Sequence, residues 1–173
     1  MTERTNITVI GMGYVGIPMA ALLADVDDDG FYVTGIQRRS QRSGWKIECL
    51  NSGKNCFEGD EPGLDELIER VVKKETFHVV DNYEKISEAD YILIDVQTPV
   101  DDHKVPRYES LKDVSKLIAP KIKKGVTVII ESTVAPGTTN NIVQPILEEG
   151  SGLKRGKTFI LYFRLKELCQ ENC

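Results

Sequence analysis

The fold of this chain is decided by the stretch ITVIGMGYVGIPMA at residues 7–20. A run rich in β-branched residues leads into the pattern G-x-G-x-x-G, and apolar residues at helical spacing follow it. In such a strand–turn–helix unit, Gly11 permits the tight turn, Gly13 lets a pyrophosphate approach the backbone, and Gly16 lets the helix pack close to the sheet. The free N–H groups at the helix start can then bind the phosphates. The sequence therefore predicts a dinucleotide site, and the alternative is a glycine-rich turn that binds nothing.

The length and composition of the chain are those of an ordinary globular domain. Its 173 residues suffice for one domain with a core, and 40% of them are apolar and 28% charged. No apolar run approaches the roughly 20 residues of a membrane span. The N-terminal residues lack the apolar core of a signal peptide, so we expect a cytoplasmic protein. The net charge of −5 argues against a general nucleic-acid-binding protein.

The cysteines and histidines do not indicate a metal site. The cysteines form two loose pairs without C-x-x-C spacing, and neither histidine lies near a cysteine in sequence. These residues are Cys49, Cys56, Cys169, Cys173, His78 and His103. We predict free thiols and no bound metal.

Strand and helix patterns alternate along the rest of the chain. The predicted strands lie at residues 7–10, 31–36, 77–80, 91–96, 125–131 and 158–163. The predicted helices lie at residues 13–24, 45–50, 62–72, 83–89 and 111–122 and around residues 142–147. This alternation predicts an α/β fold with a doubly wound, parallel, Rossmann-type sheet of about six strands. The carboxyl ends of its strands would place Gly11, Gln37, Thr98 and Thr133 along one edge.

The residue that follows the second predicted strand is unusual for a dinucleotide site. An acidic residue usually stands there and accepts a hydrogen bond from the 2′-hydroxyl of the adenosine ribose, but here the residue is Gln37. The next residues are basic or hydroxylic: Arg38, Arg39, Ser40 and Arg42. Guanidinium groups suit a 2′-phosphate, which a carboxylate would repel. Either NADP is accepted or preferred, or the arginines form a solvated turn and Gln37 binds the ribose of NAD.

Four short motifs lie between residues 11 and 139. They are G-x-G-x-x-G at residues 11–16, EPGL at 61–64, Thr98-Pro99, and ESTVAPGTT at 131–139. In this order and spacing the chain resembles the UDP-glucose and UDP-N-acetylmannosamine 6-dehydrogenases over about residues 6–163, and it is most similar to the second type. The resemblance implies an NAD-dependent oxidoreductase of polysaccharide biosynthesis that oxidises the C6 alcohol of a UDP-sugar to a carboxylate in two steps. UDP-glucose 6-dehydrogenase stays the alternative.

The resemblance assigns several residues to the phosphates and the adenosine ribose. Tyr14 and Val15 would touch the pyrophosphate. Gln37 stands where the family has its ribose-binding aspartate, and Arg42 matches an arginine near the adenosine phosphates. Arg38, directly after Gln37, would contribute at the same end of the cofactor.

Two threonines are assigned to the nicotinamide end by the same resemblance. Thr98 would lie beside the nicotinamide ribose, and Thr133 would contact the cofactor and order a catalytic water, since a hydroxyl both donates and accepts. A helix N-cap or a turn is the alternative role for both threonines. The predicted cofactor-binding residues are therefore Gly11, Gly13, Tyr14, Val15, Gly16, Gln37, Arg38, Arg42, Thr98 and Thr133.

Other parts of the family pattern are absent from this sequence. The family's glycine-flanked cysteine nucleophile and its catalytic lysine and asparagine have no counterpart here, and RLKEL at residues 164–168 replaces a Ser-Pro-Glu-Arg-like loop. We predict a dinucleotide-binding domain at residues 1–163 and an atypical, truncated tail at 164–173, without the central helix and the C-terminal UDP-sugar domain. The chain alone would be inactive, and UDP-sugar binding and homo-oligomerisation would belong to a full-length enzyme. A non-catalytic NAD(P)-binding or sensing module stays open.

Overall fold

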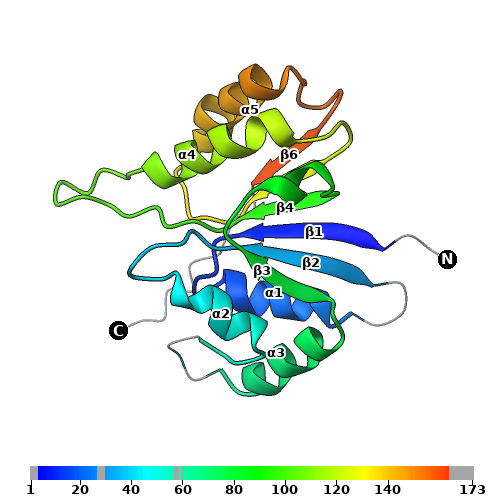
Figure 1. The fold of residues 1–173 in the computed structure, drawn as a ribbon. Coiled ribbons are helices and arrows are strands. Elements are labelled where there is room, and N and C mark those ends of the chain that lie inside the picture. The colour runs from blue at the N-terminus through cyan, green and yellow to red at the C-terminus, as the bar shows by residue number, and fades with distance from the viewer. Residues whose placement is uncertain (1–3, 27–29, 57–58, 60, 164–173) are drawn as a thin grey trace.

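A parallel β-sheet forms the centre of the molecule (Figure 1). The computed structural model describes residues 4–26, 30–56, 59 and 61–163. The strands are β1 (Thr5–Ile10), β2 (Phe31–Ile36), β3 (Phe77–Val80), β4 (Tyr91–Ile94), β5 (Thr127–Ile130) and β6 (Ile160–Phe163). All neighbouring pairs are parallel, in the order β3-β2-β1-β4-β5-β6. This is the strand order of the doubly wound dinucleotide fold, so the predicted fold class is confirmed.

Helices cover both faces of the sheet (Figure 1). On one face lie α1 (Gly16–Ala24), α2 (Trp45–Asn51) and α3 (Leu64–Lys73), and on the other lie α4 (Glu109–Ile118) and α5 (Gln144–Ser151). Successive strand residues point to opposite faces. Val9 accordingly packs in the core cluster under α1–α3, and Ile10 packs in the cluster under α4 and α5. The β-branched strand runs thus become a sheet that is buried on both sides in its centre.

Short helical turns complete the connections: η1 (Glu84–Ser87), η2 (Ala119–Lys121) and the π-helical η3 (Thr139–Val143). Two helices begin later than the sequence predicted. The helix α1 begins at Gly16 instead of Gly13, although Ile17 N already donates to Gly13 O at 3.2 Å. The helix α3 begins at Leu64 because Gly63 adopts a left-handed conformation with φ of 82°.

The fourth, fifth and sixth predicted strands are longer than the ladders that form. They pair over residues 91–94, 127–130 and 160–163. The helix predicted at 111–122 begins earlier, at Glu109, and passes into the turn η2 after Ile118. The flanking residues match the strand or helix pattern in composition, but their backbone belongs to the connecting loops.

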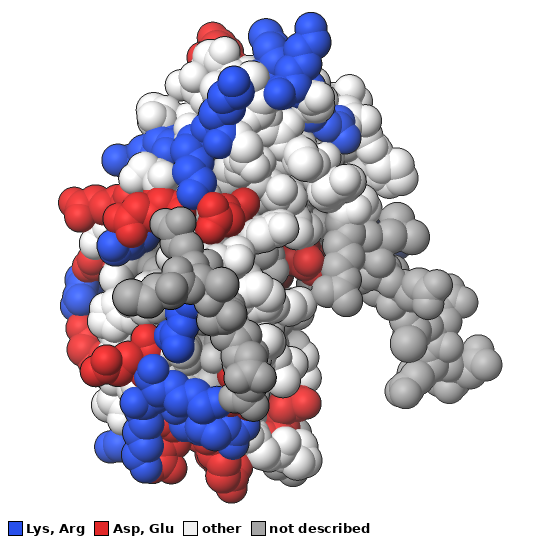
Figure 2. Space-filling view, turned by 90° about the vertical axis from the view of Figure 1, so that its right-hand side faces the viewer, with Lys and Arg blue, Asp and Glu red and all other residues white. Residues whose placement is uncertain are grey.

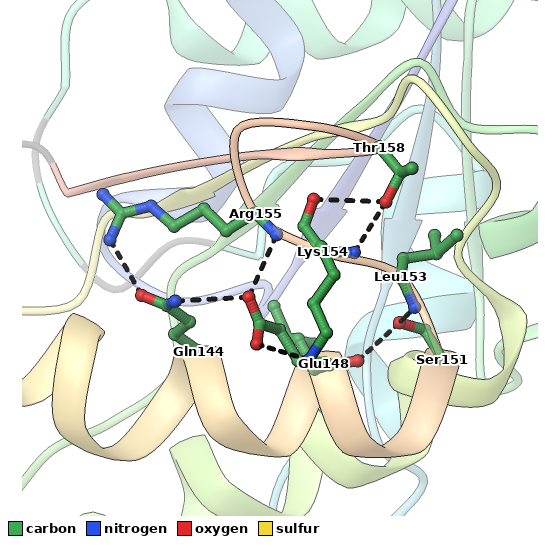
Figure 3. Close-up of polar contacts among 8 residues, drawn as sticks. Gln144, Glu148, Ser151, Leu153, Lys154, Arg155 and Thr158 are labelled. Carbon is green, nitrogen blue, oxygen red and sulfur yellow. Dashed lines mark hydrogen bonds and ion pairs between the residues drawn. The ribbon is translucent and has the colours of Figure 1, made fainter.

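A polar network holds the connection between α5 and β6 (Figure 3). The carboxylate of Glu148 accepts hydrogen bonds from Arg155 N at 3.0 Å, Lys154 Nζ at 3.1 Å and Gln144 Nε2 at 3.2 Å. The Arg155 backbone N–H, followed by the Lys154 ammonium, holds the pKa of the Glu148 carboxyl below its ordinary value. The loop that returns the chain to β6 is therefore fixed to the last turns of α5.

The surface carries charges of both signs. On the face shown in Figure 2, basic and acidic side chains lie next to one another and leave uncharged areas between them. Lys123 forms an ion pair with Asp90 at 2.7 Å, and Lys85 forms one with Glu88 at 2.8 Å. Within the described part of the chain, no helix has the length and apolar character needed to cross a bilayer.

Candidate functional site

The glycine loop closes tightly against the end of β4. Gly11 has a φ of 107°, and a Cβ on it would lie 2.1 Å from the carbonyl oxygen of Asp95. A Cβ on Gly16 would lie 1.9 Å from the carbonyl oxygen of Gly11. No side chain fits at either distance, so both positions require glycine. The close approach of β1, α1 and β4 that the motif predicts is present.

The middle of the loop is open. A Cβ on Gly13 would have no atom within 4 Å, in contrast to its two motif partners. Tyr14 is exposed, and Val15 precedes the helix as its N-cap without a side-chain hydrogen bond. The first turn of α1 contains no acidic residue. Its N–H groups and the positive end of its dipole therefore lie beside the open space at Gly13, and a helix start of this kind can bind phosphate.

Gln37 lies at the position predicted for ribose binding, and it contacts the glycine loop. Its Oε1 accepts a hydrogen bond from Met12 N at 3.2 Å. Its Nε2 donates to Ser43 Oγ at 3.0 Å and to Arg38 O at 3.2 Å. Both ends of the Gln37 amide are therefore engaged, the oxygen by the glycine loop and the nitrogen by Ser43 and Arg38.

Arg39, one of the residues predicted to suit a 2′-phosphate, is already paired with two carboxylates. Its Nε donates to Asp81 Oδ2 and its Nη1 donates to Glu48 Oε1, both at 2.8 Å. The Arg39 guanidinium is the leading cause that lowers the pKa of the Asp81 carboxyl. Arg38 and Arg42 are exposed at the same end of the loop. Of the three arginines, Arg39 is the one that the fold has already paired with carboxylates.

Two residues near the glycine loop were missed by the sequence analysis. Lys46, on α2, donates from Nζ to Met12 O at 3.3 Å. The carboxylate of Asp95 stands where β4 has ended, with Oδ2 3.4 Å from the position of a Cβ on Gly16. A charged residue directly after a buried strand was a usable sequence signal for Asp95. No local signal marked Lys46, because its contact depends on how α2 packs.

The two threonines predicted for the nicotinamide end are brought together. Thr98 Oγ1 donates to the carbonyl oxygen of Thr133 at 2.7 Å. Neither threonine caps a helix, since η3 begins after Thr138. The buried Ser132 Oγ ties the same loops together, because it accepts from Val96 N at 3.0 Å and donates to Val96 O at 2.8 Å. Thr133 is exposed at this edge, and its roles in binding and water ordering stay predictions.

Comparisons with known proteins agree with this geometry. A model of the NAD-binding domain of the UDP-glucose/GDP-mannose dehydrogenase family matches residues 5–164. The solved structure of an NDP-N-acetyl-D-galactosaminuronic acid dehydrogenase from Methanosarcina mazei is 43% identical with a TM-score of 0.86, over 95% of this chain and 35% of that one. A GDP-mannose dehydrogenase structure from Pseudomonas aeruginosa is 29% identical with a TM-score of 0.79, over 92% and 36%.

A curated relative matches this chain over a similar stretch of residues. The UDP-N-acetyl-D-mannosamine dehydrogenase of Pyrococcus horikoshii is 33% identical over 156 residues, which are 89% of this chain and 34% of that protein. The chain therefore spans about a third of the length of the proteins it matches. The names of these three proteins differ in the sugar, so the similarity does not resolve a substrate.

Proposed function

Because the chain belongs to the UDP-glucose/GDP-mannose dehydrogenase family, of which it carries the NAD-binding domain, we propose that it provides the nicotinamide cofactor site for the oxidation of a nucleotide sugar at its C6 alcohol. The observation that carries the proposal is the contrast between Gly13, which borders open space, and the tightly packed Gly11 and Gly16. That contrast is expected where a pyrophosphate must approach a backbone that is otherwise closed.

The residues of this chain would bind and orient the cofactor. The N–H groups at the start of α1 would bind the pyrophosphate, and Gln37 would face the adenosine ribose. Thr98 and Thr133 would hold the nicotinamide end, with the Thr133 hydroxyl ordering a water molecule. Bound NAD would accept the electrons removed from the sugar alcohol. The family's catalytic cysteine, lysine and asparagine have no counterpart in this sequence.

We favour UDP-N-acetylmannosamine as the sugar nucleotide, with UDP-glucose as the alternative. The support is that two similar proteins, at 43% and 33% identity, are named for N-acetylated amino sugars. For the cofactor we propose NAD, with NADP accepted, because Gln37 presents no carboxylate to a 2′-phosphate and Arg38 and Arg42 are exposed beside it.

Two measurements on the purified chain test this proposal. Calorimetric titration should show that the chain binds NAD. Steady-state assays with UDP-N-acetylmannosamine and with UDP-glucose should show no cofactor reduction above background, because the family's cysteine, lysine and asparagine are absent. A chain that binds no dinucleotide contradicts the cofactor site. Turnover that co-purifies with the chain contradicts the expected inactivity of the chain alone.

A further inference from the structure

Two cysteines lie close together at the C-terminal end of α2. Cys49 is in the last turn of the helix, and its Sγ lies 3.7 Å from the carbonyl oxygen of Lys54 and 3.8 Å from that of Asn55. The carbonyl of Asn55 belongs to the peptide bond that leads into Cys56. Cys56 is a member of the core cluster under α1–α3, and Cys49 packs against the same cluster. Both thiols are free, so two reduced sulfur atoms share one small region of the molecule.

The backbone after α2 holds the two cysteines in this arrangement. Gly53 adopts a left-handed conformation with φ of 76°, which turns the chain back along the helix. Gly53 N donates to Leu50 O at 3.0 Å, and Lys54 N donates to Cys49 O at 3.2 Å. The proximity of Cys49 and Cys56 therefore results from the way the helix ends and does not depend on the weak contacts of the thiol.

The two thiols differ in exposure. Cys49 is half-buried, whereas Cys56 is only 5% exposed. Burial is the leading cause that raises the pKa of the Cys56 thiol to about 11, and the nearby Cys49 is the next. A buried, protonated thiol reacts slowly with a dissolved oxidant, and a more accessible thiol reacts first. Cys49 is therefore the thiol that meets an oxidant, and Cys56 is placed to resolve the product.

The turn between the two cysteines covers one edge of the sheet. Asn51 is the last residue of α2, and its Nδ2 donates to Val79 O while its Oδ1 accepts from Val79 N, both at 2.8 Å. Because β3 is an edge strand, the Asn51 amide occupies backbone groups that have no neighbouring strand. A bond from Cys49 to Cys56 would span Asn51 and so hold this cover of the edge in place.

We propose that Cys49 and Cys56 form a reversible disulfide when the chain meets a hydroperoxide, and that this bond fixes the end of α2 against β3. The inference goes beyond the proposed function and does not depend on it. A disulfide stabilises mainly by restricting the unfolded chain, so the oxidised protein is the more stable form. The covalent change lies inside one turn of the chain, which leaves the sheet order unaltered.

The reaction consumes one peroxide and no other reagent. The thiolate of Cys49 attacks a peroxide oxygen, the O–O bond breaks, and the hydroxide that leaves takes up the proton of the Cys49 thiol as water. Cys56 then attacks the sulfur of the Cys49 sulfenic acid, the S–O bond breaks, and the second hydroxide leaves as water with the Cys56 proton. Two thiols are oxidised by two electrons in total, and a dithiol reverses the step by exchange.

The test treats the full chain with hydrogen peroxide after the other two cysteines are removed by Cys169→Ser and Cys173→Ser, so that only one pair can react. Free thiols are then blocked under denaturing conditions. We expect no free thiol and a tryptic digest in which residues 47–54 are linked to residues 55–70. The thermal midpoint should rise by roughly 5 °C and return to its starting value with dithiothreitol.

Single variants on the same background separate the two roles. Cys56→Ser should stop at a sulfenic acid that dimedone traps on Cys49, whereas Cys49→Ser should keep a free thiol at Cys56. The linked peptides are also mapped in the wild type, so the result does not rest on the folding of any variant. Two free thiols after treatment, a disulfide between two chains, or an unchanged thermal midpoint of the oxidised chain would overturn the inference.

Discussion

The three motif glycines differ in what a methyl group would meet. At Gly11 and Gly16 it would overlap carbonyl oxygens, whereas at Gly13 it would enter open space. The packing roles expected for Gly11 and Gly16 and the open position expected for Gly13 are therefore distinct in the structure. Substitution by alanine can therefore distinguish stability from binding within a single motif.

We expect Gly13→Ala to abolish dinucleotide binding without unfolding the chain. The φ of Gly13 is not positive, so alanine fits its backbone, and the free energy of unfolding should stay within about 0.5 kcal/mol of wild type. The added methyl group would occupy the space for the pyrophosphate, and calorimetry should show at least a roughly tenfold weaker NAD affinity. Gly16→Ala is the contrasting variant and should lose cooperative thermal unfolding. Wild-type NAD affinity in Gly13→Ala would contradict the position assigned to the pyrophosphate.

Gln37→Asp tests the preference between NAD and NADP. A carboxylate would repel a 2′-phosphate, so NADP affinity should fall roughly tenfold or more relative to NAD, as for a lost charge-assisted contact. The measurement is calorimetric titration of wild type and variant with both cofactors. The idea fails if wild-type NADP binds no better than about a tenth as tightly as NAD and the substitution leaves that ratio unchanged.

At the scale of elements, the end of α1 is tied to α3 by a charged contact. Asp25 follows the last helical residue, and its carboxylate accepts from Arg70 Nε at 2.8 Å and Nη2 at 2.7 Å. Lys74 Nζ lies 3.3 Å from the same carboxylate. The hydrogen bonds from Arg70 are the leading cause that lowers the pKa of Asp25 to about 2.

This contact predicts a pH dependence of stability. The pKa of Asp25 in the folded chain lies below its ordinary value of 3.8, so the stabilisation is complete above about pH 4 and is lost as the pH falls toward 2. Arg70 is half exposed, so we expect Asp25→Asn to cost only about 1 kcal/mol at pH 7. Urea unfolding of both proteins at pH 7, 4 and 3 should show the difference shrinking.

The control for this prediction is Glu69→Gln. It removes the exposed pair with Lys73, four residues on along α3, and should have a smaller effect at neutral pH. A difference between Asp25→Asn and wild type that is the same at every pH would mean that the asparagine acts through packing, not through charge.

At the scale of the whole molecule, alternate residues of β4, β5 and β6 share one face of the sheet, and several of their apolar side chains are exposed. The register places Tyr91, Thr127 and Ile160 in one row and Leu93, Ile129 and Tyr162 in the next. Leu93 and Ile129 pack against the core. Tyr91, Ile160 and Tyr162 are 41%, 43% and 57% exposed. Several exposed apolar side chains on one face of a sheet favour association.

We therefore expect the isolated chain to self-associate as its concentration rises. The double substitution Ile160→Thr with Tyr162→Thr removes most of the exposed apolar area while keeping residues that suit a strand, and it should lower the apparent mass in light scattering. The control is Leu117→Thr, which removes an exposed apolar side chain from α4. A wild-type chain that stays monomeric at high concentration would show that this face needs no cover.

The sequence by itself determined the class of fold, the strand regions and the family motifs. These signals are local: β-branched runs, helical spacing and glycine positions each depend on a few neighbouring residues. All six strand regions were found, as was the unit around Gly11, Gly13 and Gly16. The predicted ends of helices and strands were less accurate. For example, the helical pattern begins at Pro62, but the left-handed Gly63 excludes Pro62 from α3.

Only the tertiary structure decided which partners the polar side chains take. Arg39 lies 42 positions from Asp81, and Thr98 lies 35 positions from Thr133, yet both pairs are in contact. Met12 is likewise held by Gln37 and by Lys46, from two different elements. The parallel sheet brings the ends of distant strands to one edge, and the packing of α2 then selects which charges meet there. Those meetings depend on three-dimensional position, which residue type and local spacing do not encode.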